Sequence, residues 1–224
     1  HLVDIHRVRP FVPRELHIVP ILPGKTLGVV YLANYGPGSV LTYNELIVAP
    51  ALARYRRSFG FWISHIYIDD PDSMAGGREI WGLPKEMAQF TWDEGPRHQV
   101  VVRQGEQRLC TLRYGADRRL WRQPIVVPVH SLLQGDLLWF KGIVRARLGL
   151  GRGRLDVPPE SPFAALGLGR GRLAYHLRDM HFVAHGPKVI GRSAARREAE
   201  AADRGGIEAG MQRGKEGDAG ARLT

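Results

Sequence analysis

The stretch Gly76–Met87, which reads GGREIWGLPKEM, constrains the fold and chemistry of this 224-residue chain more than any other. Side chains of an extended strand alternate between its two faces. If this stretch is extended, one face carries four side chains, three of them large and apolar: Trp81, Leu83, Lys85 and Met87. The pattern therefore predicts a lysine that lies on an apolar surface.

Two interpretations of Lys85 follow from such a position. Its stem can lie along the apolar surface while the ammonium reaches water, which is the commoner case for lysines in proteins. Alternatively the amine is held out of water, which favours its neutral form, lowers its pKa and makes it a nucleophile toward carbonyl carbon. Pro84 restricts the backbone before the lysine, so the amine would have a rigid mount.

Three segments together resemble one known family. Gly77-Arg78-Glu79, a short spacer and Pro84-Lys85 resemble the signature of the acetoacetate decarboxylase family. The segment 43–45, Tyr-Asn-Glu, is similar to the family's Tyr-x-Glu segment, and the segment 65–70, HIYIDD, is similar to the strand that leads into the Gly-Arg-Glu loop. The likeness is good over residues 2–90, weaker to residue 192 and absent beyond.

The resemblance implies a mainly β fold with a lysine in its cavity, and homo-oligomers. It implies that Lys85 forms a Schiff base with acetoacetate or a related β-keto acid, so that the imine accepts the electrons released with carbon dioxide. No cofactor and no metal are then expected. Glu45 would transfer protons or place the substrate. Arg78 would hold a carboxylate or fix the loop, and we expect three further side chains to line the substrate site: Tyr43, His65 and Trp81.

Two positions depart from the family pattern. Glu86 stands where the family has a second lysine, although on a strand it would point to the face opposite Lys85. Val30 stands where the family has another active-site glutamate. These replacements favour an alternative, a Schiff-base aldolase, dehydratase or hydratase acting on a larger keto acid. A non-catalytic binding member of the family, with a small molecule or nucleic acid as its ligand, is the third possibility.

The rest of the chain is typical of a mainly β protein. Short apolar runs alternate with Gly- and Pro-containing turns, which predicts a closed or partly closed, barrel-like antiparallel sheet with few short helices. We expect helices at Val3–Phe11 and Ser161–Leu166. The candidate strands are Leu16–Leu22, Leu27–Asn34, Ser39–Val48, Phe59–Asp69, Phe90–Trp92, Gln99–Arg103, Arg108–Tyr114, Leu137–Leu148, Leu173–Val183 and Lys188–Ile190.

Two regions follow from composition. Residues 1–192 are predicted to form the β domain. Residues 193–224 are rich in Gly, Ala and charge and lack aromatic residues, so we expect a disordered tail with at most a helix over Ser193–Arg204.

Charge and cysteine content limit the partners. The formal net charge is +10, and all of the excess falls in residues 103–192. A basic section can serve nucleic acid, anionic lipid or an anionic substrate. We expect neither a nucleic-acid nor a membrane partner, because basic and aromatic residues do not interleave as in RNA-binding modules and no apolar run could span a bilayer. The single cysteine, Cys110, excludes an intrachain disulfide and fits a cytoplasmic location.

Overall fold

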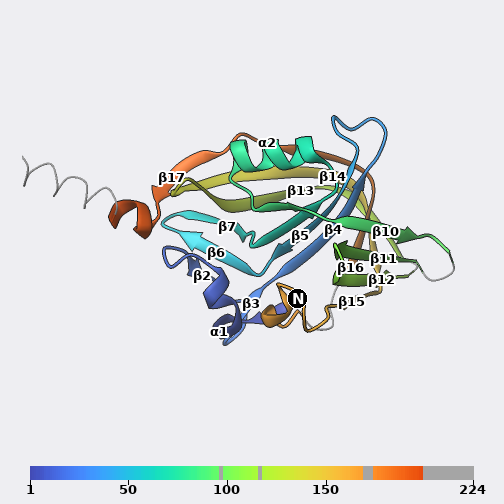
Figure 1. Cartoon of the computed structure of the whole chain (residues 1–224), viewed down its shortest axis with the longest axis horizontal. Helices are drawn as coiled ribbons and strands as arrows, with labels where there is room; N and C mark the ends of the chain where they lie inside the picture. The colour runs from blue at the N-terminus through green and yellow to red at the C-terminus, as the bar shows by residue number, and fades with distance from the viewer. Residues whose placement is uncertain (96–97, 116–117, 169–173, 199–224) are drawn as a thin grey trace, which may run out of the picture.

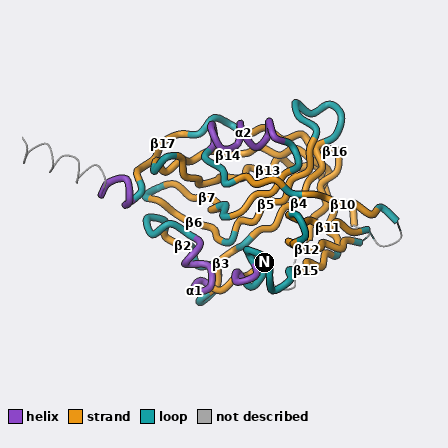
Figure 2. The backbone as a smooth tube through the Cα atoms, viewed as in Figure 1, coloured by secondary structure: helices purple, strands orange, loops and turns teal. Residues whose placement is uncertain are grey.

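Strands make up most of the described chain. The computed structural model describes residues 1–95, 98–115, 118–168 and 174–198, and Figure 2 shows how strands dominate over helices. The strands are β1 (Leu2–Asp4), β2 (His17–Ile18), β3 (Lys25–Leu27), β4 (Val29–Tyr35), β5 (Tyr43–Ala49), β6 (Ala51–Tyr55), β7 (Ser58–Trp62), β8 (His65–Ile68), β9 (Lys85–Met87), β10 (Gln89–Asp93), β11 (Gln99–Gln104), β12 (Gln107–Tyr114), β13 (Arg118–Leu133), β14 (Asp136–Gly151), β15 (Gly153–Asp156), β16 (Ala174–Ala184) and β17 (Lys188–Arg192).

The strands form four sheets. The largest has the order β16-β14-β13-β7-β6-β2, with β17 also paired to β14. Two four-stranded sheets have the orders β4-β5-β8-β9 and β10-β11-β12-β15, and β1 pairs with β3. The mainly β prediction is confirmed. No closed barrel is found among the described residues, because the strand order of each sheet is an open path. The sheets are also not purely antiparallel, since β7–β13 and β8–β9 are parallel pairs.

Helices are short and few, as predicted. They are α1 (Ile5–Val8), η1 (Arg9–Phe11), α2 (Pro71–Trp81) and η2 (Ala164–Leu166). The predicted helix Val3–Phe11 therefore begins later than expected, after β1. In Figure 1 α2 lies at the top of the molecule beside β13 and β14. No helix of the described residues is long and apolar enough to cross a membrane.

The prediction for Gly76–Met87 is wrong in its first half. The structure has a helix to Trp81 and a strand only over Lys85–Met87. Trp81 lies on the helix and packs from there into the apolar cluster on the Lys85 side of the sheet, so strand alternation does not place it. Met87 is exposed. The helix joins the parallel strands β8 and β9, which need a crossover connection.

Several strand bounds differ from the predictions. Phe59–Asp69 is two strands, broken at Ile63-Ser64, and Leu16–Leu22 has strand structure only at His17–Ile18. β6 and β13 were not predicted. β13 contains Pro124 and Pro128, residues that usually argue against a central strand. They are tolerated because β13 pairs with β7 only at its residues 129 and 130, so most of that edge needs no N–H donor for a described strand.

The start of the predicted tail contacts the domain. Residues 194–198 are helical, and Arg196 Nη1 lies 2.7 Å from Asp136 Oδ1. The remainder of the predicted helix and tail, residues 199–224, and Leu173 at the start of one predicted strand lie outside the described residues. The division into a domain and a disordered tail therefore stays a prediction.

The sheet β4-β5-β8-β9 separates two apolar clusters. One, on the face that carries Leu46, Val48 and Tyr67, is the larger and continues to β11, β12 and η2. The other, on the face that carries Ile66 and Ile68, continues to β13, β14 and α2. Each face of this sheet is thus covered by apolar side chains over its centre, so a polar side chain there is removed from water.

Candidate active site

The register of the sheet β4-β5-β8-β9 brings Glu45 and Lys85 to one face. Glu45 on β5 is opposite Ile68 on β8, and Lys85 on β9 is opposite Ile66. Ile66 and Ile68 are two residues apart and therefore point to the same side. Glu45 and Lys85 therefore point to that same side of the sheet, although they lie forty positions apart in sequence.

α2 closes the site over the lysine. Its N-cap, Asp70, accepts a hydrogen bond from the Ser73 backbone N–H at 2.7 Å, and Pro71 occupies the first helical turn. The helix ends at Gly82, whose φ of 58° is left-handed and suits glycine. The Leu83 N–H then bonds the Gly77 carbonyl oxygen at 3.0 Å. The last helical residue is therefore Trp81, and the chain turns back so that β9 packs against α2.

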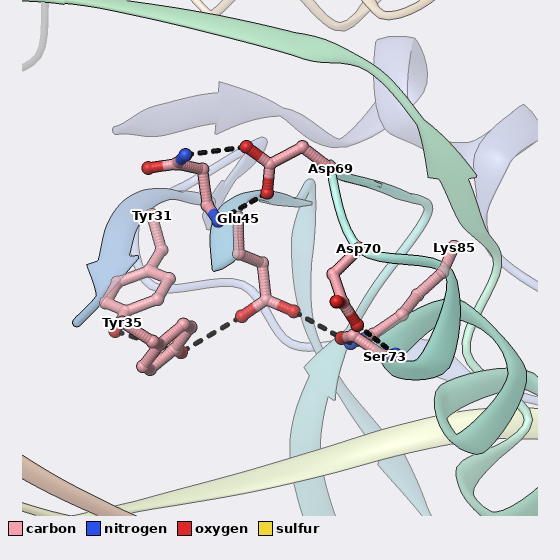
Figure 3. Close-up of polar contacts among 8 residues, drawn as sticks. Tyr31, Tyr35, Glu45, Asp69, Asp70, Ser73 and Lys85 are labelled. Atoms are coloured by element: carbon pink, nitrogen blue, oxygen red, sulfur yellow. Dashed lines mark hydrogen bonds and ion pairs between the residues drawn. The ribbon is translucent and has the colours of Figure 1, made fainter. Parts of the chain in front are cut away.

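The Lys85 amine has two polar partners, Glu45 and Ser73 (Figure 3), and one aromatic neighbour, Tyr43. Its Nζ lies 3.1 Å from Glu45 Oε1 and donates to Ser73 Oγ at 2.8 Å. It also lies 5.2 Å from the ring centroid of Tyr43, within cation–π range. Lys85 is 6% and Glu45 5% exposed. The structure therefore places the amine out of water, the second of the two interpretations open from the sequence.

Gly77 allows the lysine stem to lie flat against α2. A Cβ built on Gly77 would lie 2.5 Å from Lys85 Cδ and 2.6 Å from Cε. Such distances do not occur between real Cβ atoms and their neighbours. The glycine of the Gly-Arg-Glu string is thus required for packing, and any side chain there would displace the lysine.

A chain of hydroxyl groups extends from the other oxygen of Glu45. The Tyr35 hydroxyl donates to Glu45 Oε2 at 3.0 Å, and the Tyr31 hydroxyl lies 3.3 Å from that of Tyr35. Figure 3 shows both rings on the side of Glu45 away from Lys85. The Tyr31 hydroxyl also contacts Met180 Sδ on β16, at 3.2 Å. Both glutamate oxygens therefore have fixed partners.

Burial keeps these tyrosines protonated. Desolvation, followed by the Glu45 charge, raises the pKa of Tyr35 far above its ordinary value. Desolvation also raises the pKa of Tyr31 to about 12, against a smaller opposing effect of the hydrogen bond with Tyr35. A neutral Tyr35 donates toward the carboxylate, so its oxygen can only accept from Tyr31, whose single hydroxyl hydrogen is shared between Tyr35 and Met180 Sδ.

The other predicted substrate residues lie in different surroundings. Arg78 is exposed, and its Nε donates to the Lys85 carbonyl oxygen at 2.8 Å, which fixes the loop. Trp81 packs in the apolar cluster on the lysine face, and its Nε1 donates to the His185 carbonyl oxygen at 3.0 Å. Of these residues only Tyr43 contacts the amine. Substrate contact by Arg78 or Trp81 stays a prediction.

His65 and Val30 do not face the lysine. His65 precedes Ile66 on β8, so its side chain points to the opposite side of the sheet. Val30 on β4 is opposite Val48 on β5, and the β4 residue opposite Glu45 is Ala33. The family's second glutamate therefore has no counterpart at Val30 that could face the site. Glu86 does point away from Lys85, as alternation predicts, and accepts a hydrogen bond from Gln104 Nε2 at 2.9 Å.

Sequence reasoning missed two residues that shape the site, Tyr35 and Ser73. Tyr31, Ala33 and Tyr35 alternate along one strand, but Tyr35 fell just outside the predicted bound. Ser73 was hidden because α2 was not predicted, although Asp70-Pro71 before it is a helix start signal. Among the described residues no three His, Cys, Asp or Glu side chains gather as metal ligands would.

The family assignment rests on more than half of the chain. The sequence profile described as acetoacetate decarboxylase (ADC) matches residues 1–133, which include Lys85 and the side chains that contact its amine. The chain belongs to the acetoacetate decarboxylase family.

Within this family the curated relatives are only distantly similar. Protein NEOXANTHIN-DEFICIENT 1 of Solanum lycopersicum is 30% identical over 91 residues, which are 41% of this chain and 30% of that protein. Acetoacetate decarboxylase 3 of Mesorhizobium japonicum is 36% identical over 63 residues, 28% of this chain and 21% of that protein. The alignments thus span less than a third of these relatives.

Solved structures share the family fold. An acetoacetate decarboxylase matches with a TM-score of 0.65 at 16% identity, covering 85% of this chain and 84% of that one. The enduracididine biosynthesis enzyme MppR matches with a TM-score of 0.63 at 17% identity, covering 85% and 83%. An acetoacetate decarboxylase-like enzyme from Sphingomonas wittichii matches with a TM-score of 0.59 at 12% identity, covering 85% and 89%. At these identities the likeness concerns the fold.

The arrangement can carry out covalent acid–base chemistry. A primary amine, a carboxylate 3.1 Å away and a neutral phenol on the other carboxylate oxygen provide a nucleophile, a proton acceptor and a proton donor in series. Desolvated surroundings strengthen each of these interactions.

Proposed function

We propose that this protein is a Schiff-base lyase that decarboxylates acetoacetate or a related β-keto acid on Lys85. One observation carries the proposal: the Lys85 amine is buried and contacts Glu45 and Ser73 at 3.1 and 2.8 Å. A lysine that only covers apolar surface keeps its amine in water. Membership of a family named for this reaction supports the same choice.

The first half of the reaction forms the imine. Glu45 accepts a proton from the Lys85 ammonium, and the neutral amine attacks the keto carbon, forming the C–N bond while the carbonyl oxygen takes up a proton. Loss of that oxygen as water, with a proton returned by Glu45, leaves a protonated imine. Since Glu45 contacts the nitrogen directly, each proton moves across one hydrogen bond.

The second half releases the products. The bond between the carboxylate carbon and the α-carbon breaks, and its electron pair moves toward the imine nitrogen, giving carbon dioxide and an enamine. Protonation of the enamine carbon restores an imine. Water then adds to the imine carbon, the C–N bond breaks, and the ketone leaves with the lysine regenerated. Ser73 would hold the nitrogen in place throughout through its hydroxyl.

A second function is favoured by the tyrosines. An aldolase, dehydratase or hydratase acting through the same imine needs a further acid–base group away from the lysine nitrogen, and Tyr35 with Tyr31 supplies hydroxyls on the far side of Glu45. MppR, which shares the fold, has been solved with pyruvate and with a condensation product of pyruvate and imidazole 4-carboxaldehyde. Larger keto acids are the substrate class of this alternative.

A keto-acid panel separates the two functions. Carbon dioxide release and substrate loss would be measured with acetoacetate, other β-keto acids and pyruvate plus an aldehyde, using the Lys85→Gln variant as control. Lys85-dependent gas release from a β-keto acid supports the lyase proposal. Lys85-dependent condensation or dehydration without gas release replaces it by the alternative, and no turnover or adduct leaves a binding protein of the family fold.

The proposal includes three further points that come from the sequence. The substrate is a small molecule and no nucleic acid is bound, the protein forms homo-oligomers, and it is located in the cytoplasm. Gel-shift, light-scattering and fractionation measurements test these points separately from the reaction.

A further inference from the structure

A second pocket lies on the other face of the β8–β9 pair from Lys85. It has a volume of about 340 Å³, in the range of small-molecule sites. Its walls come from η1, the β7–β8 connection, the segment before β9 and the end of β13, and six of its residues carry the argument: Phe11, Trp62, His65, Gly82, Pro84 and Leu132. None of the groups that contact the lysine amine lines it.

The walls are mainly apolar and aromatic. The Trp62 Nε1 donates to the Phe11 carbonyl oxygen at 2.7 Å, which joins two walls and leaves the indole face as apolar surface. The rings of Phe11 and His65 lie 6.1 Å apart, and Phe163 meets His65 edge-on at 5.7 Å. Such a lining suits a flat, apolar ligand body.

The hydrogen bonds of Ser64 determine what His65 offers. The Ser64 hydroxyl donates its single hydrogen to the Val48 carbonyl oxygen, at 3.3 Å, because a carbonyl can only accept. The Ser64 oxygen then accepts from the His65 Nδ1–H at 2.8 Å. Burial lowers the pKa of His65, and the Glu86 carboxylate offsets only part of this shift, so the ring is neutral near pH 7.

A neutral imidazole with a hydrogen on Nδ1 carries a lone pair on Nε2. Within the part of the chain that the structure describes, Nε2 has no hydrogen-bond partner, and it is not a sealed buried atom either. The pocket therefore combines an aromatic slot with one unused acceptor.

We propose that this pocket is a second small-molecule site that binds an aromatic ring bearing one hydroxyl, which donates to His65 Nε2. It is separate from the Lys85 site and does not depend on Schiff-base chemistry. Gly82 and Pro84 form part of its wall and also begin the segment that holds Lys85. A ligand there contacts the backbone segment that precedes Lys85 without touching the amine.

The test uses p-cresol and 4-fluorotoluene, which share ring and shape but differ in the O–H donor. Histidine-¹⁵N-labelled protein reports the His65 Nε2 resonance, assigned with the His65→Gln variant. We expect p-cresol to shift this resonance saturably and 4-fluorotoluene to bind about threefold to tenfold more weakly, which is the usual net effect of one hydrogen bond. Lys85→Gln should bind p-cresol as the natural protein does.

Two variants localise the binding. Leu132→Phe reduces the pocket volume and should weaken both ligands, whereas Ser64→Ala frees the Nδ1 hydrogen and should reduce the preference for p-cresol. The proposal is overturned if p-cresol shows no saturable His65 shift up to its solubility limit, or if both ligands bind equally. If Leu132→Phe does not fold, the ligand pair alone decides. Loss of p-cresol binding in Lys85→Gln would also overturn it, by placing the ligand at the catalytic lysine.

Discussion

Gly77 and Lys85 pack so closely that a methyl group on Gly77 would lie 2.5 Å from Lys85 Cδ. The helix α2 and the strand β9 are thus fitted to each other at the lysine stem. This contact explains why a glycine interrupts a helix at a position where glycine costs about 1 kcal/mol relative to alanine.

The first prediction concerns that contact. Gly77→Ala should displace the Lys85 stem and slow keto-acid adduct formation by tenfold or more, about the effect of a 1 Å misplacement of a reacting group. The matched control is Gly76→Ala, because a Cβ at Gly76 meets nothing within 4 Å. The control should raise the free energy of unfolding by up to about 1 kcal/mol and leave the adduct rate unchanged. Equal adduct rates for the two variants would contradict the packing argument.

The second prediction concerns Glu45. Glu45→Gln keeps the shape of the side chain but removes the proton acceptor, so the adduct rate should fall by about 10²–10⁴-fold. Removing one partner of a buried ion pair should also lower the free energy of unfolding, by about 3–5 kcal/mol. Rapid-quench trapping and urea unfolding measure the two effects. Glu86→Gln, at an exposed position on the strand that carries Lys85, should change neither.

The third prediction assigns Tyr35 as a positioning residue for Glu45. Tyr35→Phe removes the hydroxyl that donates to Glu45 Oε2. Because this hydrogen bond holds the Glu45 carboxylate in place beside the Lys85 amine, its loss should lower the rate of adduct formation. Tyr67→Phe is the control, since Tyr67 is 1% exposed but faces the other side of the sheet. An unchanged adduct rate in Tyr35→Phe would contradict this assignment.

The fourth prediction concerns acid stability. His130 is fully buried, and desolvation lowers its pKa to about 4 from an ordinary 6.5. The unfolded chain takes up this proton near pH 6.5, whereas the folded protein takes it up only near pH 4. The contribution of neutral His130 to the free energy of unfolding is therefore fully present above pH 6.5. It is lost as the pH decreases toward 4, by roughly 3 kcal/mol in all.

The variant His130→Gln checks this assignment. Urea midpoints measured from pH 7 to pH 4 should fall less steeply in the variant than in the natural protein, since glutamine does not titrate. Parallel pH dependence in both proteins would assign the acid sensitivity to other groups.

The chemistry of the site was easier to predict from sequence than its local structure. The Gly-Arg-Glu string, Pro84-Lys85 and Tyr43-Asn44-Glu45 predicted that Lys85 and Glu45 would act together, and the structure brings them within 3.1 Å. Period-two alternation over Gly76–Met87 predicted a strand, but the N-cap Asp70, Pro71 at the helix start and the left-handed Gly82 favour a helix over its first half. Asp70 and Pro71 lie before the stretch and Gly82 lies within it, so alternation inside the stretch does not reveal where the helix begins.

The contributions of Tyr35 and Ser73 depend on long-range register. Tyr35 contacts Glu45 because β4 and β5 pair with Tyr35 opposite Tyr43, and Ser73 reaches the amine because α2 crosses from β8 to β9. Neither pairing is encoded within a short window. His65 was assigned to the substrate site by its nearness in sequence, whereas a single residue step along a strand reverses its face.

Borohydride trapping of the imine tests the central claim most directly. The protein would be incubated with a saturating β-keto acid and with pyruvate, reduced with sodium borohydride and mapped by peptide mass spectrometry. We predict a stoichiometric adduct on Lys85, none on the other four lysines (Lys25, Lys141, Lys188 and Lys215), and none in Lys85→Gln. An unmodified Lys85 at saturating keto acid, or labelling spread evenly over the other lysines, would contradict the account.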